Sequence, residues 1–381
     1  MQAVSSVAVL GATGSIGTSC LDVIRRHRSR MRAVGLTAYR NSGLLRQQVA
    51  EFQPDWAILD SQCRGTFIDD SPTRWHFDLE LVCDFVRRPD VDVVVSAMVG
   101  AAGLPATVAA VDAGKRVALA NKETMVVAGA MVMNRAAETG ATIIPVDSEH
   151  SAVYQCLQSG RPAEVKRVVL TASGGPFRGW TRSQLQTVTP QMALKHPTWQ
   201  MGRKITIDSA TMMNKALEII EARWLFGLSR HQLAVVIHPQ SVIHSLVEFA
   251  DGAVITQMSP PDMRLPIQYA LTYPSRLDCP APSVDWASPM NLELSPPDFD
   301  TFPALRLGFE VAEAGGSAGV VLNAANEVAV ERFLNLELRF DQITQVAEEI
   351  LRHHQYDASP GLHSLMQLDG WARKEALRWT P

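Results

Sequence analysis

Short apolar runs alternate with longer amphipathic stretches along the first 146 residues, and this alternation is the strongest constraint on the fold. The apolar runs show little of the every-second-residue pattern of a half-exposed strand, as expected for strands covered by helices on both faces. Strand patterns that alternate with helix patterns predict a parallel, doubly wound sheet. We expect strands at 4–10, 32–38, 56–60, 91–98, 116–120 and 142–146, with helices that include those near 104–113 and 124–138.

After Ser148 the pattern changes to longer strands and one long helix. The segments VKRVVLTAS and AVVIHPQSVIHSLVEFADGAVITQMS are typical of antiparallel strands, and Asp251-Gly252 is a favoured hairpin turn. Between them, DSATMMNKALEIIEARWLF predicts a helix. Prolines crowd between residues 260 and 303, which predicts an extended linker without helix or central strand. The chain is helical again from about residue 304, so an α+β region and a small helical bundle should follow the α/β domain.

The composition is that of an ordinary globular protein, with 46% hydrophobic and 19% charged residues. The net charge of −4 shows no basic excess, which argues against a nucleic-acid partner. No apolar run is long enough to cross a membrane, and the first predicted strand begins almost at Met1, which leaves no room for a targeting peptide. The five cysteines are odd in number and lack any CxxC spacing, so we expect reduced thiols and a cytoplasmic location.

A glycine-rich turn, GATGSIG, joins the first predicted strand to the first helix. Glycines there allow a tight turn and a close approach of the backbone to a pyrophosphate, which the N-terminus of the helix attracts. A structural turn without a phosphate is the alternative. The strand–turn–helix context favours a dinucleotide site, with contacts from Thr13, Gly14, Ser15 and Ile16.

The end of the second strand indicates which dinucleotide would bind. An NAD site usually has an acidic residue there for the ribose 2′-hydroxyl. This chain has Tyr39-Arg40-Asn41 instead, and a guanidinium matches a 2′-phosphate in charge and geometry. The residues favour NADP(H), with an arginine that only faces solvent as the alternative.

Two acids follow the strand at 142–146, in the segment Asp147-Ser148-Glu149. Residues two apart in an extended segment point the same way, so the two carboxylates should lie together. Oxygen donors without a thiolate suit Mg²⁺ or Mn²⁺. The alternative is that Asp147 or Ser148 caps the helix that begins near residue 149.

A third acid in the chain could complete such a metal site. On the helix after Ser209, Asn214 and Glu218 are four residues apart and share a face, with Lys215 beside them. Glu218 could hold the metal while Ser209, Asn214 and Lys215 bind an anion. From spacing alone, an exposed ion pair between Lys215 and Glu218 is the favoured alternative.

Three further segments combine polar groups with an irregular pattern. Asn121-Lys122-Glu123 directly follows a strand, where an open α/β sheet binds its ligands. Ser173-Gly174-Gly175 ends the next strand with a hydroxyl and two glycines that are suited to cup a phosphate. The loop KHPTWQMG contains His196, Trp199, Met201 and Gly202, and its exposed aromatic residue and hinge glycine are typical of a lid.

Together these segments resemble the 1-deoxy-D-xylulose 5-phosphate reductoisomerase family, in motifs spread over nearly the whole chain. The matching motifs are GATGSIG, VVSAMVGAAGL, LANKE, PVDSEH, SGGPFR, HPTWQMGRKITIDSATMMNKALEIIEA, IHPQSVIHS and LNAANEVAV. One departure is Tyr39, where the family commonly has glycine. That difference bears on the fine geometry of the 2′-phosphate subsite.

The resemblance implies a fold, a set of cofactors and a set of residue roles. The implied domains are a Rossmann-like NADPH-binding domain at 1–147, a catalytic domain at 148–272 with a lid near 193–203, a linker at 273–303 and a four-helix domain at 304–381. The implied metal ligands are Asp147, Glu149 and Glu218, for Mn²⁺, Mg²⁺ or Co²⁺. Substrate contacts are implied for Lys122, Ser148, Glu149, Ser173, His196, Trp199, Ser209, Asn214, Lys215 and Glu218. NADPH contacts are implied for Thr13, Gly14, Ser15, Ile16, Tyr39, Arg40, Asn41, Asn121, Glu123 and Gly202, and a homodimer is implied as well.

The implied reaction converts a keto sugar phosphate to a branched aldehyde, which NADPH reduces to 2-C-methyl-D-erythritol 4-phosphate in the non-mevalonate isoprenoid pathway. Lys122, Asp147, Glu149 and Glu218 are the implied catalytic residues. A retro-aldol/aldol sequence and an α-ketol shift both give that aldehyde. The alternatives are an NADP-dependent dehydrogenase of the semialdehyde or homoserine type, for which Cys156 would be the nucleophile to test, and a regulator that senses NADP without catalysis.

Overall fold

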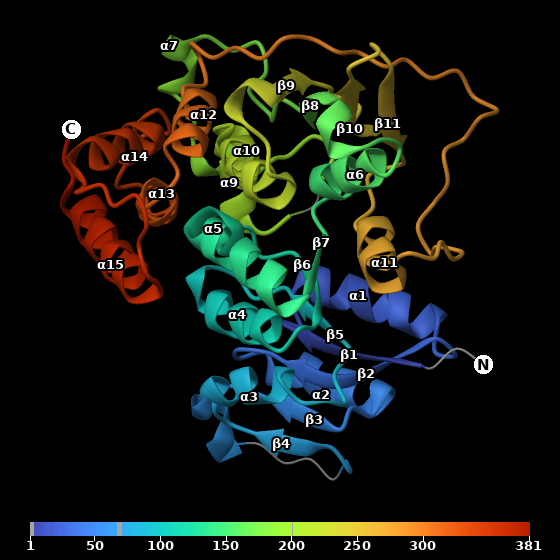
Figure 1. Cartoon of the computed structure of the whole chain (residues 1–381). Coiled ribbons are helices and arrows are strands. Elements are labelled where there is room, and N and C mark those ends of the chain that lie inside the picture. The colour runs from blue at the N-terminus through green and yellow to red at the C-terminus, as the bar shows by residue number, and fades with distance from the viewer. Residues whose placement is uncertain (1–3, 67–70, 200) are drawn as a thin grey trace. The chain divides into compact units, whose positions relative to one another are not determined.

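The computed structural model describes residues 4–66, 71–199 and 201–381. The chain divides into two compact units (Figure 1). The first comprises Met1–Thr124, Met131–Ser151 and Asp262–Ser283, and the second comprises Met125–Ala130, Ala152–Pro261 and Val284–Pro381. Residues 262–283 thus belong to the first unit, although the sequence-based division assigned 262–272 to the catalytic domain and 273–283 to the linker. The division into the four segments inferred from the sequence stays a prediction.

Among the described residues, the first unit has a seven-stranded sheet in the order β4-β3-β2-β1-β5-β6-β7, with every neighbouring pair parallel. Its strands are β1 (Ser5–Leu10), β2 (Met31–Thr37), β3 (Trp56–Ile58), β4 (Arg74–His76), β5 (Val93–Ser96), β6 (Arg116–Leu119) and β7 (Thr142–Pro145). The prediction of a parallel, doubly wound sheet is confirmed. Strand β4 was not predicted, because its Arg-Trp-His sequence carries no apolar run.

Helices accompany this sheet in the expected alternation. They are α1 (Ser15–Arg26), α2 (Ser42–Phe52), α3 (Val82–Val86), α4 (Leu104–Asp112), α5 (Lys122–Thr139) and α11 (Arg264–Thr272). Short 3₁₀ turns connect further elements along the chain at Ser61–Thr66, Leu79–Leu81, Ala101–Gly103, Pro162–Glu164 and Arg230–Gln232. Strands β1 and β5 are neighbours, and the chain proceeds from β1 toward one edge of the sheet and from β5 toward the other. A sheet of this kind binds ligands at the carboxyl ends of the two strands where the order reverses.

Helix α11 corrects the prediction that the proline-rich segment contains no helix. Pro266 lies in the third position of α11, within the first turn. The N–H groups of a first turn have no acceptor in their own helix, so a proline there removes no helical hydrogen bond. The remaining residues of α11 are mostly buried, and the helix packs against α1, β6 and β7.

The second unit has a four-stranded sheet in the order β11-β10-β8-β9, within the part of the chain that the structure describes. Its strands are β8 (Val165–Ala172), β9 (Leu233–Ile237), β10 (Ile243–Phe249) and β11 (Val254–Met258). Strand β10 is antiparallel to β8 and β11, and the predicted hairpin is present, with Gly252 at a φ of +87°. The pairing of β8 with β9 is parallel, which the prediction of antiparallel strands missed. The long connection between these two strands, which contains four α-helices in its described residues, makes a parallel pairing feasible.

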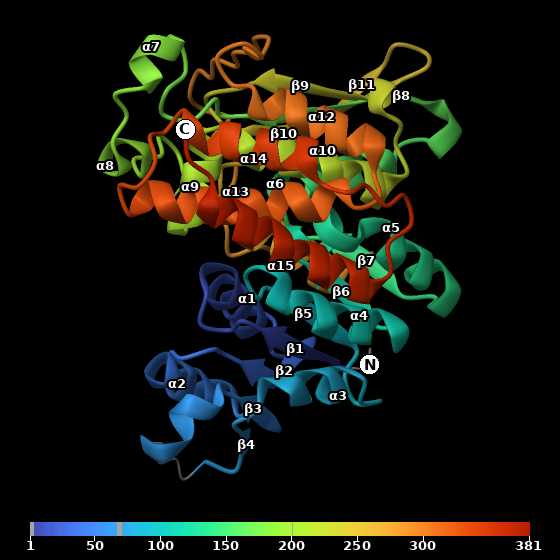
Figure 2. The same ribbon diagram turned by 90° about the vertical axis from the view of Figure 1, so that its left-hand side faces the viewer.

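Helices complete the second unit. Before the proline-rich segment they are α6 (Ser148–Leu157, which starts in the first unit), α7 (Arg182–Leu185), α8 (Pro190–Ala193), α9 (Arg203–Ala210) and α10 (Met213–Phe226). Residues 304–381 are all described and form α12 (Ala304–Ala314), α13 (Ala318–Leu334), α14 (Gln342–His353) and α15 (Leu362–Arg378). Helix α13 is largely buried and packs against α14, α15 and α9 (Figure 2). The predicted helical C-terminal region is confirmed, whereas its assignment as a separate four-helix domain stays a prediction.

The helix predicted across residues 208–226 is broken at Met212. This residue has a φ of +63°, in the left-handed region that a side chain with a Cβ rarely adopts, and it separates α9 from α10. The apolar pattern continues through the break, so it could not be predicted from the pattern. A backbone held in this region often marks a functional site, because the surrounding structure must compensate for its energy.

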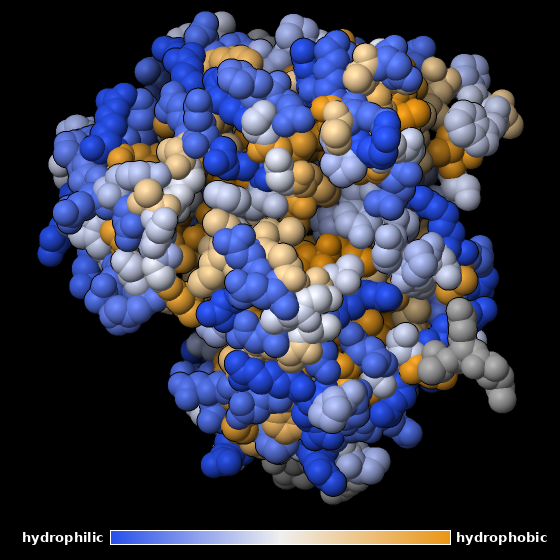
Figure 3. Space-filling view, in the orientation of Figure 1, coloured by the Kyte–Doolittle hydropathy of each residue, from blue (hydrophilic) through white to orange (hydrophobic). Residues whose placement is uncertain are grey.

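Hydrophilic residues cover most of the face seen in Figure 3, with smaller groups of hydrophobic residues among them. None of the helices in the described residues combines the length and the apolar composition that a membrane crossing needs.

Candidate active site

The predicted nucleotide residues lie at the carboxyl edge of the first unit's sheet. The glycine-rich turn follows β1, and the β1–β2 register pairs Leu10 with Thr37, so the turn and the Tyr39–Asn41 segment emerge at the same edge. Gly11 has a φ of +86°, and a Cβ on it would lie 2.6 Å from the carbonyl oxygen of Ala97, so only glycine fits. Sequence reasoning missed the support for this turn: Thr37 Oγ1 accepts from Gly11 N at 3.0 Å, and buried Gln48 donates to the Ala12 carbonyl at 2.9 Å.

Thr13, Gly14, Ser15 and Ile16 lead from this turn into α1. Gly14 occupies the position just before the helix, and Ser15 begins it. Gly14 and Ser15 are exposed, while Thr13 and Ile16 are half-buried. The first turn of α1 contains no acidic side chain, so nothing there opposes the attraction of a helix N-terminus for an anion.

Tyr39 and Arg40 form an exposed pair after β2. The Arg40 guanidinium donates to the Tyr39 hydroxyl at 3.1 Å and lies 4.7 Å from the centre of the Tyr39 ring. Asn41 caps α2 by accepting from Leu44 N at 3.2 Å. The tyrosine therefore holds the guanidinium over its own ring, where it remains accessible to an anionic ligand.

Asn121 is tied to the protein framework by its whole side chain. Its Nδ2 donates to the carbonyl oxygens of Met98 at 2.6 Å and Gly100 at 3.0 Å, and to Glu123 Oε2 at 3.1 Å. Its Oδ1 accepts from Thr124 N at 2.8 Å, which caps α5. Asn121 thus fixes the loop after β5 to the start of α5. Lys122, in the first turn of α5, is buried.

Asp147 serves two partners at once. Its Oδ1 accepts from the backbone N–H groups of Glu149 at 3.1 Å and His150 at 3.3 Å, which caps α6, and its Oδ2 forms an ion pair with Lys122. The capping alternative is therefore correct for Asp147, but it involves only one carboxylate oxygen, while the other pairs with Lys122. The expectation that Asp147 and Glu149 lie in an extended segment is wrong, because Glu149 is already in the first turn of α6. The Ser148 hydroxyl donates to Glu149 Oε2.

Glu218 lies on α10 and is almost fully buried, as is Lys215. Glu218 accepts a hydrogen bond from Asn214 Nδ2 at 2.5 Å and forms an ion pair with Lys215. The i, i+4 relation of Asn214 and Glu218 was predicted and is confirmed. The alternative predicted an exposed ion pair between Lys215 and Glu218. The ion pair is present, but it is buried, so the predicted exposure is wrong. Helix α10 begins directly after the break at Met212, so the break lies just before Asn214 and Lys215.

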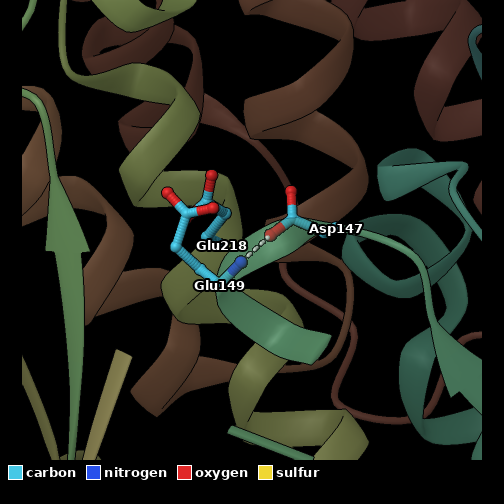
Figure 4. Close-up of side chains that lie close together, drawn as sticks. All are labelled: Asp147, Glu149 and Glu218. Atoms are coloured by element: carbon cyan, nitrogen blue, oxygen red, sulfur yellow. Dashed lines mark hydrogen bonds between the residues drawn. The ribbon is translucent and has the colours of Figure 1, made fainter. Parts of the chain in front are cut away.

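The carboxylates of Asp147, Glu149 and Glu218 each offer one oxygen, and these oxygens all lie within 4.8 Å of one another. Figure 4 shows the three side chains turned toward one another, with the Glu149 N–H directed at Asp147. Three carboxylates at such distances repel one another unless cations balance them. Lys122 and Lys215 balance two, which leaves one net negative charge for a further cation. The all-oxygen donor set therefore fits Mg²⁺ or Mn²⁺.

Ser173, His196 and Ser209 converge in the second unit. His196 Nε2 lies 3.2 Å from Ser173 Oγ and 3.1 Å from Ser209 Oγ, while His196 Nδ1 accepts from Trp199 N at 2.9 Å. An Nδ1 that accepts must carry the lone pair, so the neutral ring bears its proton on Nε2 and donates toward the two hydroxyls. Burial lowers the pKa of His196, which favours this neutral form.

The loop after Ser173 passes very close to α9. Gly175 has a φ of +67°, and a Cβ on it would lie 2.8 Å from the carbonyl oxygen of Ser209, so a side chain there would push the two segments apart. The Ser173 hydroxyl also accepts from Gly175 N at 3.2 Å. The glycine therefore brings the two serine hydroxyls near each other, as a small anion would require.

Trp199 packs edge-on against His244, with the ring centres 6.3 Å apart. His244 is buried, with Nε2 3.1 Å from the carbonyl oxygen of Ser259, and it was not among the predicted site residues although it lies in the motif IHPQSVIHS. Met201 is half-buried and Gly202, just before α9, is exposed. Gln200, inside the predicted lid, lies outside the described residues.

Cys156 gives no support to a thiol nucleophile. It is buried in α6, and burial raises its pKa to about 11. A nucleophilic cysteine needs a depressed pKa to form its thiolate at neutral pH. The environment of Cys156 is the opposite, which argues against the semialdehyde dehydrogenase alternative.

Comparisons with known proteins point to one family over nearly the whole chain. The family model for 1-deoxy-D-xylulose 5-phosphate reductoisomerase matches residues 7–129. The model for the 1-deoxy-D-xylulose 5-phosphate reductoisomerase C-terminal domain matches residues 143–226, and the model for the DXP reductoisomerase C-terminal domain matches residues 258–375. The 1-deoxy-D-xylulose 5-phosphate reductoisomerase of Rhodopirellula baltica is 47% identical over 98% of this chain and 94% of its own length. That of Pseudomonas aeruginosa is 46% identical over 98% of this chain and 97% of its own.

Two solved structures are similarly close. A DOX-P reductoisomerase in complex with NADPH, fosmidomycin and magnesium has a TM-score of 0.93 and 41% identity, and the match covers 98% of each chain. The reductoisomerase of Zymomonas mobilis in complex with NADPH has a TM-score of 0.92 and 40% identity, and the match covers 99% of each chain.

Proposed function

The chain belongs to the 1-deoxy-D-xylulose 5-phosphate reductoisomerase family, and on that premise we propose that it converts 1-deoxy-D-xylulose 5-phosphate to 2-C-methyl-D-erythritol 4-phosphate with NADPH and a divalent metal ion. The observation that carries the proposal is the group of three convergent carboxylates, Asp147, Glu149 and Glu218. Such a group can hold a divalent ion that stabilises charge developing on two neighbouring substrate oxygens, which suits a rearrangement better than a hydride transfer alone.

Asp147, Glu149 and Glu218 would hold Mn²⁺, Mg²⁺ or Co²⁺. When bound, such an ion stabilises negative charge on neighbouring oxygens of a substrate and fixes their orientation. The protein prepares this position in two ways: Asp147 is fixed by its cap hydrogen bonds to α6, and Glu218 by its bond from Asn214. Each carboxylate therefore loses little freedom when it becomes a ligand.

Lys122 would act on the carbonyl oxygen that receives the hydride. Its ammonium is almost fully buried and is oriented by Asp147. A positive charge in a poorly solvated site stabilises a developing alkoxide far more than it would in water. Ser148, which donates to Glu149, lies in the same segment and would contact the reacting end of the sugar.

The substrate phosphate would bind to Ser173, Ser209, Asn214 and Lys215, with His196 as a neutral donor. Both hydroxyls lie within 3.2 Å of His196 Nε2, so the protein's own contacts hold these three side chains together. Because the other His196 nitrogen accepts from Trp199 N, a phosphate that orders His196 also orders the lid. Binding energy at the phosphate would then hold Trp199 over the substrate and exclude water from the reaction.

NADPH would lie along the carboxyl edge of the first sheet. Thr13, Gly14, Ser15 and Ile16 would contact the pyrophosphate at the N-terminus of α1, and Tyr39, Arg40 and Asn41 the adenosine 2′-phosphate. Asn121 would contribute through its backbone, since its side chain is fully engaged. Glu123 and Gly202 complete the proposed contacts.

We also propose a homodimer. Strand β11 is a sheet edge whose Val254 and Ile255 are exposed, and Leu292 and Leu294 of the proline-rich segment are exposed as well. Apolar side chains at an unpaired edge favour association with another strand. Light scattering on the purified protein should give twice the chain mass, and the chain mass alone would exclude the dimer.

A cytoplasmic location is proposed from the cysteines. All five lie within the described residues and none forms a disulfide. Reduced thiols are the usual state in a reducing compartment.

The test is the loss of NADPH absorbance on addition of 1-deoxy-D-xylulose 5-phosphate, with and without Mn²⁺. We expect oxidation that requires both additions. NADPH oxidation with aspartate semialdehyde, which a homoserine dehydrogenase reduces, or with aspartyl phosphate, which a semialdehyde dehydrogenase reduces, would instead favour the dehydrogenase alternative. NADPH binding with no turnover of any of these would favour a sensor.

A further inference from the structure

Asp208 is a fully buried carboxylate that the proposed mechanism does not use. It lies in the last turn of α9, where the negative end of the helix dipole disfavours an acid, while its partner Lys204 lies in the first turn, where a cation is disfavoured. Burial of a carboxylate costs several kcal/mol unless polar partners compensate it. An apolar side chain would fill this position at lower cost, so packing alone does not explain the aspartate.

The compensation comes from a distant part of the chain. Asn326, on α13 and also fully buried, donates from Nδ2 to Asp208 Oδ1 at 2.8 Å. Lys204 Nζ lies 3.0 Å from Asp208 Oδ2. The residues that hold Asp208 thus come from its own helix and from the centre of the C-terminal bundle, 118 positions away in the sequence.

The next residue after Asp208 is Ser209, whose hydroxyl lies 3.1 Å from His196 Nε2. A hydrogen bond to a charged group is both stronger and more directional than a packing contact. The bond from Asn326 therefore fixes the last turn of α9, which carries Ser209, both in its rotation about the helix axis and in its position along that axis. A small displacement there would move one hydroxyl of the pocket away from the other.

We propose that Asn326 is a positioning residue for the substrate phosphate: by binding Asp208, it holds the Ser209 hydroxyl in the pocket, so that the C-terminal helices take part in substrate binding. This inference rests on the proposed function for its kinetic consequence. Its structural consequence, the fixation of α9, can be measured without substrate.

The chain offers a matched control in Asn323. It is one turn earlier on α13, is equally buried, and donates from Nδ2 to Glu327 Oε1 at 3.2 Å within its own helix. Asn323→Ala and Asn326→Ala both remove one amide from the same buried helix. Only the second removes a bond to α9.

The first measurement is hydrogen–deuterium exchange of the α9 amides in the full chain without substrate. Asn326→Ala should raise exchange across 203–210 about tenfold, a change worth ~1.4 kcal/mol of local stability. Asn323→Ala should leave α9 as in the wild type. Equal protection of α9 in both variants would overturn the proposal, whether or not the proposed reaction is correct.

The second measurement is steady-state kinetics with the metal-loaded enzyme. Asn326→Ala should raise KM for the sugar phosphate about tenfold, with kcat changed much less, while Asn323→Ala keeps the wild-type KM. Asn326→Leu, which is close to asparagine in size but has no donor for Asp208, gives the same test if Asn326→Ala fails to fold. A wild-type KM in both the Asn326→Ala and Asn326→Leu enzymes would refute the role in substrate binding. An inactive wild type would instead contradict the proposed function.

Discussion

At the scale of single residues, Arg40 is the group that should distinguish NADPH from NADH. Its guanidinium is exposed and is held by Tyr39. Arg40→Ala should weaken NADPH binding about tenfold or more, since a hydrogen bond to a charged group contributes ~1.5–3 kcal/mol, and should leave NADH binding nearly unchanged. Fluorescence titration with the two cofactors measures this. Equal losses would contradict a contact with the 2′-phosphate.

Tyr39→Phe is the control for that experiment. It keeps the ring beneath the guanidinium and removes only the oxygen that accepts from Arg40. The NADPH affinity of this variant should fall by about two- to fivefold, less than in Arg40→Ala, because a single exposed hydrogen bond contributes ~0.5–1 kcal/mol. A loss as large as that of Arg40→Ala would mean that the Tyr39 hydroxyl contributes as much to cofactor binding as the guanidinium.

Asp147 allows metal binding to be separated from folding. Asparagine caps helices as well as aspartate, so Asp147→Asn should keep the cap on α6 and the fold, while the loss of the ion pair with Lys122 lowers the melting temperature. Mn²⁺ affinity should fall at least about tenfold, because one of three carboxylate ligands loses its charge. Calorimetric titration measures it, with Asp298→Asn, another backbone cap, as the control. Unchanged Mn²⁺ affinity in Asp147→Asn would remove this residue from the ligand set.

At the scale of elements, His196 links the lid to the phosphate pocket and makes stability depend on pH. Burial lowers its pKa, so the unfolded chain binds more protons than the folded one below the ordinary histidine pKa of about 6.5. The free energy of unfolding should therefore fall as pH drops below that value. His76 contributes in the same direction, so His196→Asn should reduce the slope without abolishing it. A slope equal to the wild type's would show that His196 is not the group involved.

The lid itself is tested by Trp199→Ala. The ring packs on His244 through an edge contact, and its loss removes little of the core. Turnover should fall about tenfold or more while the melting temperature changes little, because the lid acts on the closed complex. A wild-type turnover would exclude Trp199 from closure.

The elements also show how far the sequence could be interpreted. Apolar runs predicted the parallel strands and the terminal bundle, because burial on both faces leaves a clear pattern. Positional effects were missed: Pro266 is tolerated in the first turn of α11, and Met212 breaks a continuous helical pattern. For the site, the spacing of Asn214 and Glu218 predicted a shared face. No spacing could show that residues seventy or more positions apart, such as Asp147 and Glu218, would meet; only the family resemblance supplied that.

At the scale of the whole molecule, the account requires that one chain both rearranges a carbon skeleton and reduces it. The most direct measurement is the structure of the product formed from 1-deoxy-D-xylulose 5-phosphate, Mn²⁺ and NADPH deuterated at its hydride-donating carbon. NMR of the product should show a branched methyl-erythritol phosphate that carries the deuterium. An unbranched reduction product, or a branched one without deuterium, would contradict the account.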